Sequence, residues 1–391
     1  MPRFEPFTAI RYADRFAPES VTAPPYDVVS ASARAELLAR SEVNVVAIDM
    51  PTGPDAYTGA AATFARWRSD GVLVDDDRPS FTIYRMRTID ADGRAHDTIG
   101  ALGAMTLSRP EEGQILPHEF TTPKAKSDRL DLLRATRANL SAVWGLTPSP
   151  GFTDLLTVDA PPLWHFEADG VTHTVWRVDD PERLAAISAA VASAPVVIAD
   201  GHHRFETSLA HRDERAAAGD LAGDDAVLCF IVELADDRLS VGPIHRQVSG
   251  VPDGPALLDH LSEHFELAPF DLDGPDVVDR LVAIGALGLC TRDGQWSLTP
   301  RPALVDACRD LDSSRLDHAL AAYADATLTY EHDIDAAFAA VHDGDCVAAV
   351  LLRPVTVAQI VGIAEGGERM PPKSTFFAPK PRTGVVFRSL L

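Results

Sequence analysis

Apolar and polar residues follow two different periods along this chain, and the two periods predict different elements. An apolar residue at every third or fourth position is typical of an amphipathic helix, and strict alternation is typical of a strand with one buried face. On this basis, helices are predicted over residues 30–40, 57–70, 127–139, 181–192, 205–218, 313–323 and 333–342. Strands are predicted over residues 43–50, 80–88, 97–107, 173–178, 196–199, 227–234, 244–248 and 346–352. This mixture predicts an α/β or mixed α+β fold.

Turn-forming residues mark the boundaries between these elements. Asp92-Gly93 predicts a hairpin turn, and Arg292-Asp293-Gly294 predicts a second hairpin over residues 288–298. Residues 108–124 resemble a loop, and residues 251–285 are predicted to be mostly helical. The run 196–199 is continuously apolar, which is typical of a strand buried on both faces of a sheet.

Composition and charge restrict the environment and the partners. Apolar residues make up 46% of the 391 residues and charged residues 24%, as in ordinary soluble proteins. The net charge of −23 repels nucleic acid and anionic membranes, so neither is expected as a partner and any anion site must be a local basic island. The chain shows no apolar run of the ~20 residues that cross a bilayer and no signal-peptide pattern. Four widely spaced cysteines without a CxxC pair favour reduced thiols, and a cytoplasmic location is expected.

The segment Asp200-Gly201-His202-His203-Arg204 lies where the apolar run 196–199 gives way to a helix. Gly201 permits a tight turn, and the first helical turn offers N–H groups and a positive dipole end to an anion. Arg204 adds a bidentate donor for phosphate and is expected to face a ligand. Asp200 fits a general base or a helix cap, and either histidine fits an acid, a base or a donor. An ordinary capped Asp-Gly turn is the structural alternative.

A metal site at the same place has less support. His202 and Glu206 lie four residues apart, on one face of the predicted helix. No second ligand pair follows at a known metal-binding spacing, so no protein-held metal is predicted.

Residues 116–129, together with Arg134 and Arg137 further along the predicted helix, form a second candidate, a basic island in an acidic chain. Its cations are Lys124, Lys126, Arg129, Arg134 and Arg137, against only Glu119, Asp128 and Asp131. Glu119 follows His118 next to these cations and is our candidate for a general base. A solvated helix with ion pairs is the alternative.

The third candidate is the proline-rich C-terminal segment from Met370 onward, which holds four basic residues and no acidic one. Lys373, Ser374 and Lys380 are candidate phosphate contacts there. Lys373-Ser374-Thr375 resembles the end of a P-loop, but the upstream glycines have the wrong spacing, which excludes a Walker A site. Prolines and aromatic residues favour a docked lid over a freely solvated tail.

These segments together resemble the DUF1015 family of bacterial and archaeal proteins. The matching stretches are PPYDVV (24–29), HEFTTPKAKSDRLDLLRATRANLSAVWGL (118–146), IADGHHRFETSL (198–209), PIHR (243–246) and MPPKSTFFAPKPRTGVVF (370–387). The resemblance covers almost the whole chain, so a single unit over residues 1–391 is expected. A subdivision into an N-terminal α/β part (1–110), a phosphate-binding core (111–250) and a C-terminal part with a docked tail (251–391) stays open. The chain departs from the family at Phe120, where a lysine or arginine is common, and at Phe205, where tyrosine is common.

The DGHHR stretch is also similar to the phosphate-binding motif of the ParB/sulfiredoxin-like superfamily, which includes free-serine kinases. The resemblance implies a ParB/sulfiredoxin-like core around the strand–turn–helix, with additional mixed-sheet and helical elements. It implies a small-molecule kinase that uses ATP, ADP or pyrophosphate and acts on a hydroxyl such as that of free L-serine. By position, Asp200, His202, His203 and Arg204 would hold the donor phosphates. The superfamily's catalytic carboxylate has no aligned match here, and Glu119 takes that place on its chemistry alone.

Phosphoryl transfer is therefore the leading functional hypothesis, with Mg²⁺ bound mainly by the phosphate donor. A ParB-like nucleotide-binding regulator and a phosphohydrolase remain as alternatives, and the oligomeric state stays open. The predicted catalytic residues are Glu119, Asp200 and His202, and the predicted phosphate-binding residues are Gly201, His203, Arg204, Lys124, Lys126, Arg129, Lys373, Ser374 and Lys380.

Overall fold

The computed structural model has a mixed α/β fold, which confirms the predicted fold class, and it divides into two compact units. It describes residues 1–89, 93–119, 123–235 and 239–391, and of these the side chains of residues 123–126, 240 and 365 are not described. The first unit is Met1–Ser240 together with Pro379–Leu391, and the second is Val241–Ala378. The second unit is thus inserted into the chain of the first.

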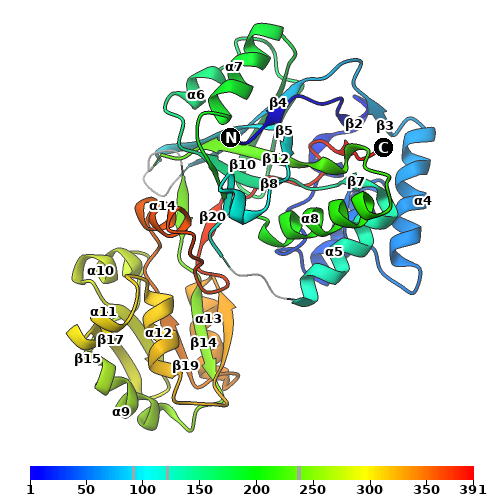
Figure 1. Ribbon diagram of the computed structural model, residues 1–391. Helices are drawn as coiled ribbons and strands as arrows, with labels where there is room; N and C mark the ends of the chain where they lie inside the picture. The colour runs from blue at the N-terminus through cyan, green and yellow to red at the C-terminus, as the bar shows by residue number, and fades with distance from the viewer. Residues whose placement is uncertain (90–92, 120–122, 236–238) are drawn as a thin grey trace. The chain divides into compact units, whose positions relative to one another are not determined.

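A nine-stranded mixed sheet forms the centre of the first unit (Figure 1). Its order is β6-β11-β8-β12-β5-β4-β10-β9, with β1 paired to β5. The strands are β1 (Phe4–Glu5), β4 (Phe81–Ile89), β5 (Ala95–Thr106), β6 (Ile115–Pro117), β8 (Val143–Thr147), β9 (Trp164–Ala168), β10 (Val171–Val178), β11 (Val196–Asp200) and β12 (Ala226–Glu233). Antiparallel pairing of β4 with β5 confirms the predicted hairpin, although Asp92 of its turn lies outside the described residues. β11 lies between β6 and β8, as its continuous apolar run predicts.

Helices cover this sheet in two groups. They are α1 (Pro18–Val21), α2 (Ala31–Arg40), α3 (Val46–Asp49), α4 (Ala56–Ser69), α5 (Pro123–Thr136), α6 (Phe152–Leu155), α7 (Pro181–Val191) and α8 (His202–Ala217), with 3₁₀ turns η1 (Pro110–Glu112) and η2 (Gly223–Asp225). α5 packs against both α4 and α8, and Figure 1 shows these three helices together, apart from the α6–α7 pair. Two short antiparallel pairs complete the unit, β2 (Ile10–Tyr12) with β3 (Leu73–Asp75) and β7 (Ala138–Asn139) with β21 (Arg388–Ser389).

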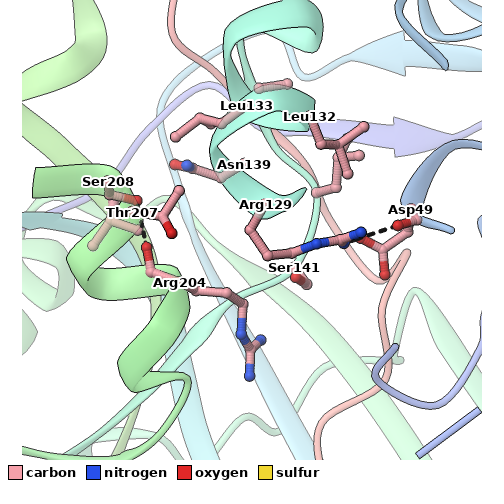
Figure 2. Close-up of a pocket in the computed structure, with 12 residues that line it drawn as sticks. Asp49, Arg129, Leu132, Leu133, Asn139, Ser141, Arg204, Thr207 and Ser208 are labelled. Carbon is pink, nitrogen blue, oxygen red and sulfur yellow. Dashed lines mark hydrogen bonds and ion pairs between the residues drawn. The ribbon is translucent and has the colours of Figure 1, made fainter. Parts of the chain in front are cut away.

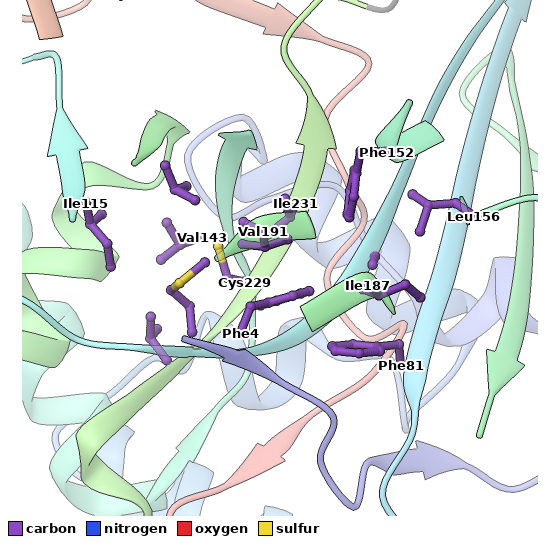
Figure 3. Close-up of a cluster of buried hydrophobic side chains, with 14 of the residues drawn as sticks. Phe4, Phe81, Ile115, Val143, Phe152, Leu156, Ile187, Val191, Cys229 and Ile231 are labelled. Carbon is purple, nitrogen blue, oxygen red and sulfur yellow. The ribbon is translucent and has the colours of Figure 1, made fainter. Parts of the chain in front are cut away.

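The core of the first unit joins segments that are distant in sequence. In Figure 3, Phe4 of β1 and Phe81 of β4 lie side by side, with ring centroids 4.9 Å apart, near Ile187 of α7. A second cluster contains Phe64 of α4 and Phe387, which is fully buried. The C-terminal residues 379–391 are therefore an integral part of this unit.

The second unit is built on a six-stranded antiparallel sheet of order β15-β17-β16-β19-β14-β18. Its strands are β14 (His245–Ser249), β15 (Phe265–Pro269), β16 (Leu287–Thr291), β17 (Gly294–Pro300), β18 (Thr327–Glu331) and β19 (Ala348–Leu351), with a separate pair β13 (Ser240–Gly242) and β20 (Phe376–Ala378). Its helices are α9 (Gly254–His264), α10 (Val277–Ile284), α11 (Pro302–Ala307), α12 (Asp312–Leu320), α13 (Ile334–Asp343) and α14 (Val357–Glu365). β16 and β17 form the hairpin predicted around Arg292-Asp293-Gly294.

Several sequence predictions are wrong in detail. The segment 43–50 is predicted as a strand, but it contains the short helix α3, because the Asn44 side chain accepts a hydrogen bond from the Val46 N–H and stabilises the start of the helix. The predicted loop 108–124 contains β6, and the predicted helical stretch 251–285 contains β15. β6 spans only three residues, too few to establish a period, and β15 begins directly where α9 ends, so no turn residue marks its start.

Candidate active site

The predicted anion-binding segment forms a strand–turn–helix in the first unit. β11 ends at Asp200, Gly201 adopts a left-handed conformation with φ of 88°, and α8 begins at His202. A Cβ atom on Gly201 would lie 3.0 Å from Arg204 Nε, so a larger residue is disfavoured by both backbone and space. Because the N-cap is glycine, no N-cap side chain occupies the start of the helix.

Arg204 is held by the protein and also lines a pocket. Its Nη2 donates to Asp200 Oδ2 at 2.5 Å, and its Nη1 donates to the carbonyl of Ala142. Only 11% of its side chain is exposed. The guanidinium is therefore oriented before any ligand arrives.

Lys380 joins this ion pair from the C-terminal segment. Its Nζ lies 3.0 Å from Asp200 Oδ1 and 2.5 Å from Asp27 Oδ2. Burial alone would raise the pKa of Asp200, but the charges of Lys380 and Arg204 hold that pKa well below its usual range. Burial opposes the charge on Lys380 in the same way, and Asp200 and Asp27 outweigh it, so its pKa is raised. Both groups are therefore charged at neutral pH.

Arg129 forms a neighbouring cluster with Tyr26 and Asp49. Its guanidinium lies 4.3 Å from the centroid of the Tyr26 ring and donates to the Asp49 carbonyl at 2.8 Å and to Asp49 Oδ1 at 3.2 Å. Asp49 is almost fully buried, and burial raises the pKa of its carboxyl despite the nearby Arg129 and Arg204.

Arg129 and Arg204 line the same small pocket between α5 and α8, where Figure 2 shows Arg129 directed toward Asp49. Thr207 and Ser141 add hydroxyl groups to the lining. The volume is about 50 Å³. A cavity of this size holds a few water-sized groups and is well below the ~300–1,000 Å³ of drug-sized ligand sites. It suits a phosphate-sized group.

The parallel strands β6 and β11 bring a second predicted segment to the motif. Their register pairs Pro117 with Ile198, so His118 and Glu119 leave β6 beside the end of β11. The ring centroids of His118 and His202 are 4.7 Å apart and nearly perpendicular. His118 is fully buried, and burial lowers its pKa to about 4 despite a hydrogen bond with Ile198 and the charge of Asp200, so it is neutral at pH 7.

The remaining predicted residues have different surroundings. The side chains of Lys124 and Lys126 lie outside those that the structure describes. Lys373 and Ser374 belong to the second unit, where Lys373 is exposed and the Ser374 hydroxyl lies 3.2 Å from that of Ser313. His203 is half-buried on the first turn of α8.

Two other cations of the basic island form ion pairs in the first unit. Arg134 bonds Asp131 and Glu214 at the surface, as the solvated-helix alternative describes. Arg137, which follows the end of α5, bonds the buried Asp224 instead.

Three residues that contact the predicted ones, Tyr26, Asp27 and Asp49, were not among the predicted site residues. A signal existed for Tyr26 and Asp27, because they belong to the PPYDVV stretch. Asp49 had none, since it lies in a segment predicted as a strand. Among the described side chains, no group of three or more His, Cys, Asp or Glu could hold a metal ion. Nor does any helix in the described ranges have the length and apolar character to cross a membrane.

Comparisons with known proteins identify the chain's relatives. A family model described as "Protein of unknown function (DUF1015)" matches residues 4–318. No curated protein matches the sequence.

Similar solved structures include a conserved hypothetical protein from Pyrococcus furiosus, with 14% identity, a TM-score of 0.40, and coverage of 74% of this chain and 95% of that one. They also include a free serine kinase in complex with AMP, with 12% identity, a TM-score of 0.40, and coverage of 71% and 87%. A third is SbnI with a C-terminal truncation from Staphylococcus aureus, with 11% identity, a TM-score of 0.39, and coverage of 72% and 84%.

Proposed function

This chain belongs to the DUF1015 family, whose function is unknown, and we propose from its own site that it is a small-molecule kinase. The reaction moves a phosphoryl group from ATP, ADP or pyrophosphate to a hydroxyl group, and free L-serine is the first acceptor to test. The resemblance of DGHHR to the free-serine kinase motif suggests this acceptor.

One observation carries the proposal. β6 and β11 are adjacent and parallel, so Glu119, two residues after the end of β6, and Asp200, the last residue of β11, lie at the same edge of the sheet. Ligands of α/β proteins bind at the carboxyl ends of strands, where helix N-termini favour anions. This edge therefore combines a helix start that favours anions with a carboxylate, Glu119, that can accept the proton of an acceptor hydroxyl, as in phosphoryl transfer.

The residues divide into distinct roles in this proposal. The first turn of α8, Arg204 and Lys380 bind the phosphates of the donor, and Arg129 contributes from the pocket wall. Asp200 is a weak base because its pKa is so low, so it orients Arg204 and Lys380. Glu119 accepts the proton of the acceptor hydroxyl. His118 is neutral at pH 7 and positions His202 through their ring contact.

Mg²⁺ is proposed to bind mainly through the phosphates of the donor. The described residues supply no three-residue ligand set for a metal. Mg²⁺ commonly keeps several waters and binds through substrate phosphates with few protein ligands. It would thus enter with the donor and reduce the charge on the transferred group.

The test is incubation of the purified protein with Mg²⁺, L-serine and ATP, ADP or pyrophosphate in turn, followed by ³¹P NMR. Formation of a phosphate monoester of serine is expected. Glu119→Gln should reduce turnover about 10²-fold or more while donor affinity changes little, because a general base contributes on the order of 10²–10⁴. Glu111→Gln, which alters an exposed carboxylate eight residues away, is the matched control and should keep full activity.

The same experiment discriminates among the alternatives. Free phosphate without phosphoserine would reject the kinase and favour a phosphohydrolase. Nucleotide binding without either product would favour a regulator. Equal turnover of Glu119→Gln and Glu111→Gln would remove Glu119 from the mechanism.

A further inference from the structure

A second cavity of the first unit shares no lining residue with the pocket between α5 and α8. Its volume is about 200 Å³. The walls come from β2, β3, β9 and β10, with Val385 of the C-terminal segment. Neither the resemblance nor the proposed reaction assigns it a role.

Most of the wall is apolar. Trp164 is half-buried on β9 and Val175 is buried on β10, opposite Trp164 in the antiparallel register. Leu163 and Val74 also line the cavity, although they are 51% and 43% exposed. Large apolar side chains left exposed around a concave surface are typical of ligand sites.

The polar part of the cavity centres on the buried Arg11. Its Nε donates to both carboxylate oxygens of Asp76, at 3.0 and 3.1 Å, and its Nη2 donates to Thr82 Oγ1 at 2.6 Å. Arg177 Nε lies 4.0 Å from the same Asp76 carboxylate. Two guanidinium groups thus share one carboxylate at this position.

Three further carboxylates lie near these arginines. Asp77 and Asp179 pair with Arg177 but do not line the cavity, and Asp14 lines it from an exposed position. Burial lowers the pKa of Arg11, Asp76 opposes this, and the charge of Arg177 lowers it further. Asp76, Asp77 and Asp179 offset part of the charge on Arg177, and its side chain, which is 22% exposed against 9% for Arg11, is the more accessible of the two cations to a ligand carboxylate.

We propose that this cavity binds a small carboxylate with an apolar or aromatic body. The carboxylate lies against Arg11 and Arg177, and the body packs on Trp164, Leu163 and Val74. This site is independent of the proposed kinase reaction, because it uses none of the same residues.

Phenylacetate is the probe for this site, and phenylacetamide, which has the same shape without the charge, is the control ligand. Isothermal titration of the full chain is expected to give a dissociation constant on the order of 1 mM for phenylacetate. Binding of phenylacetamide should be at least about tenfold weaker, because it lacks the charge-assisted bonds to arginine.

Two variants complete the test. Leu163→Glu places a carboxylate at the half-exposed wall and should weaken phenylacetate binding about tenfold or more through charge repulsion. Leu221→Glu changes a leucine of 48% exposure that does not line the cavity, and should leave binding unchanged. Pyrophosphate, a probe of the kinase site, should not displace phenylacetate. The proposal is overturned if phenylacetate does not bind, if the amide binds equally well, if Leu163→Glu has no effect, or if pyrophosphate competes.

Discussion

Gly201 couples the turn after β11 to the position of Arg204. Two features disfavour any side chain at residue 201. The backbone φ is 88°, and a Cβ atom would lie only 3.0 Å from Arg204 Nε. Gly219 follows α8 with φ of 71° and has open space around the Cβ position, so only the first feature applies to it. Gly201→Ala should therefore lower the free energy of unfolding by about 1–2 kcal/mol more than Gly219→Ala, within the ~1–3 kcal/mol of such strain. Urea unfolding of both variants measures this, and equal losses would contradict the steric role.

Lys380 neutralises two carboxylates that are 173 positions apart in the sequence, Asp27 and Asp200. Lys380→Met should cost about 3 kcal/mol of unfolding free energy at pH 7, because breaking a buried ion pair leaves uncompensated charge. Lys380→Arg keeps the charge and should lose less.

The pH dependence of that loss has a definite sign. The folded pKa of Asp200 lies below its ordinary value of 3.8, so the pair stabilises the fold above that pH and less as the pH falls through it. The difference between wild type and Lys380→Met should therefore shrink between pH 5 and pH 3 in urea unfolding. A constant difference would show that lost packing, not charge, causes the destabilisation.

α3 depends on one buried side chain at its start. Asn44 donates to the carbonyls of Ser20 and Thr22, at 2.8 and 3.1 Å, and accepts from the Val46 N–H at 3.1 Å. Asn44→Ala should lower the free energy of unfolding by about 2–3 kcal/mol, because it leaves buried backbone groups unpaired. Ser30→Ala removes the exposed cap of α2 and should cost about 1 kcal/mol. Thermal unfolding compares the two, and a smaller loss for Asn44→Ala would be inconsistent with its role in pairing these buried groups.

Element-scale prediction succeeded where the local pattern was long. β4, β5, α4, α7 and α13 lie within one or two residues of their predicted bounds, because their periods extend over six residues or more. β6 has only three residues, and its neighbour β11 lies about 80 positions later in the sequence. No local period identifies such a strand, since its hydrogen bonds form with a distant segment.

At the scale of the whole molecule, buried histidines determine the response to acid. Burial lowers the pKa of His118 and His173 in the first unit, and of His245 in the second, from 6.5 to about 4. The unfolded chain binds more protons between these values, so stability should fall as the pH decreases from about 6.5 to about 4. Asp49 and Asp317 act in the opposite direction because their pKa values are raised by burial.

Urea unfolding at several pH values between 7.5 and 4 tests this expectation. Because three histidines oppose two carboxyls, the midpoint should decrease over this range. A midpoint that is constant or rises toward pH 4 would be inconsistent with neutral buried histidines.

The sequence by itself determined the mixed α/β class, most of the longer elements, and the strand–turn–helix from β11 to α8. These features depend on interactions between residues close in sequence, such as apolar periodicity and the conformation of Gly201. The DUF1015 resemblance was likewise visible in the sequence, and the family match over residues 4–318 confirms it.

Tertiary structure alone decided which groups meet at Asp200. Lys380 reaches Asp27 across 353 positions, and Arg129 reaches Asp49 across 80. Such contacts follow from how the sheet pairs its strands and from where the C-terminal segment is buried, neither of which leaves a local period in the sequence. For the same reason, the unit boundaries after residues 240 and 378 are seen only in the fold, whereas the sequence suggested boundaries after residues 110 and 250. The strand–turn–helix at Asp200 thus depends on local sequence, whereas long-range packing brings to it the charged groups that pair with it.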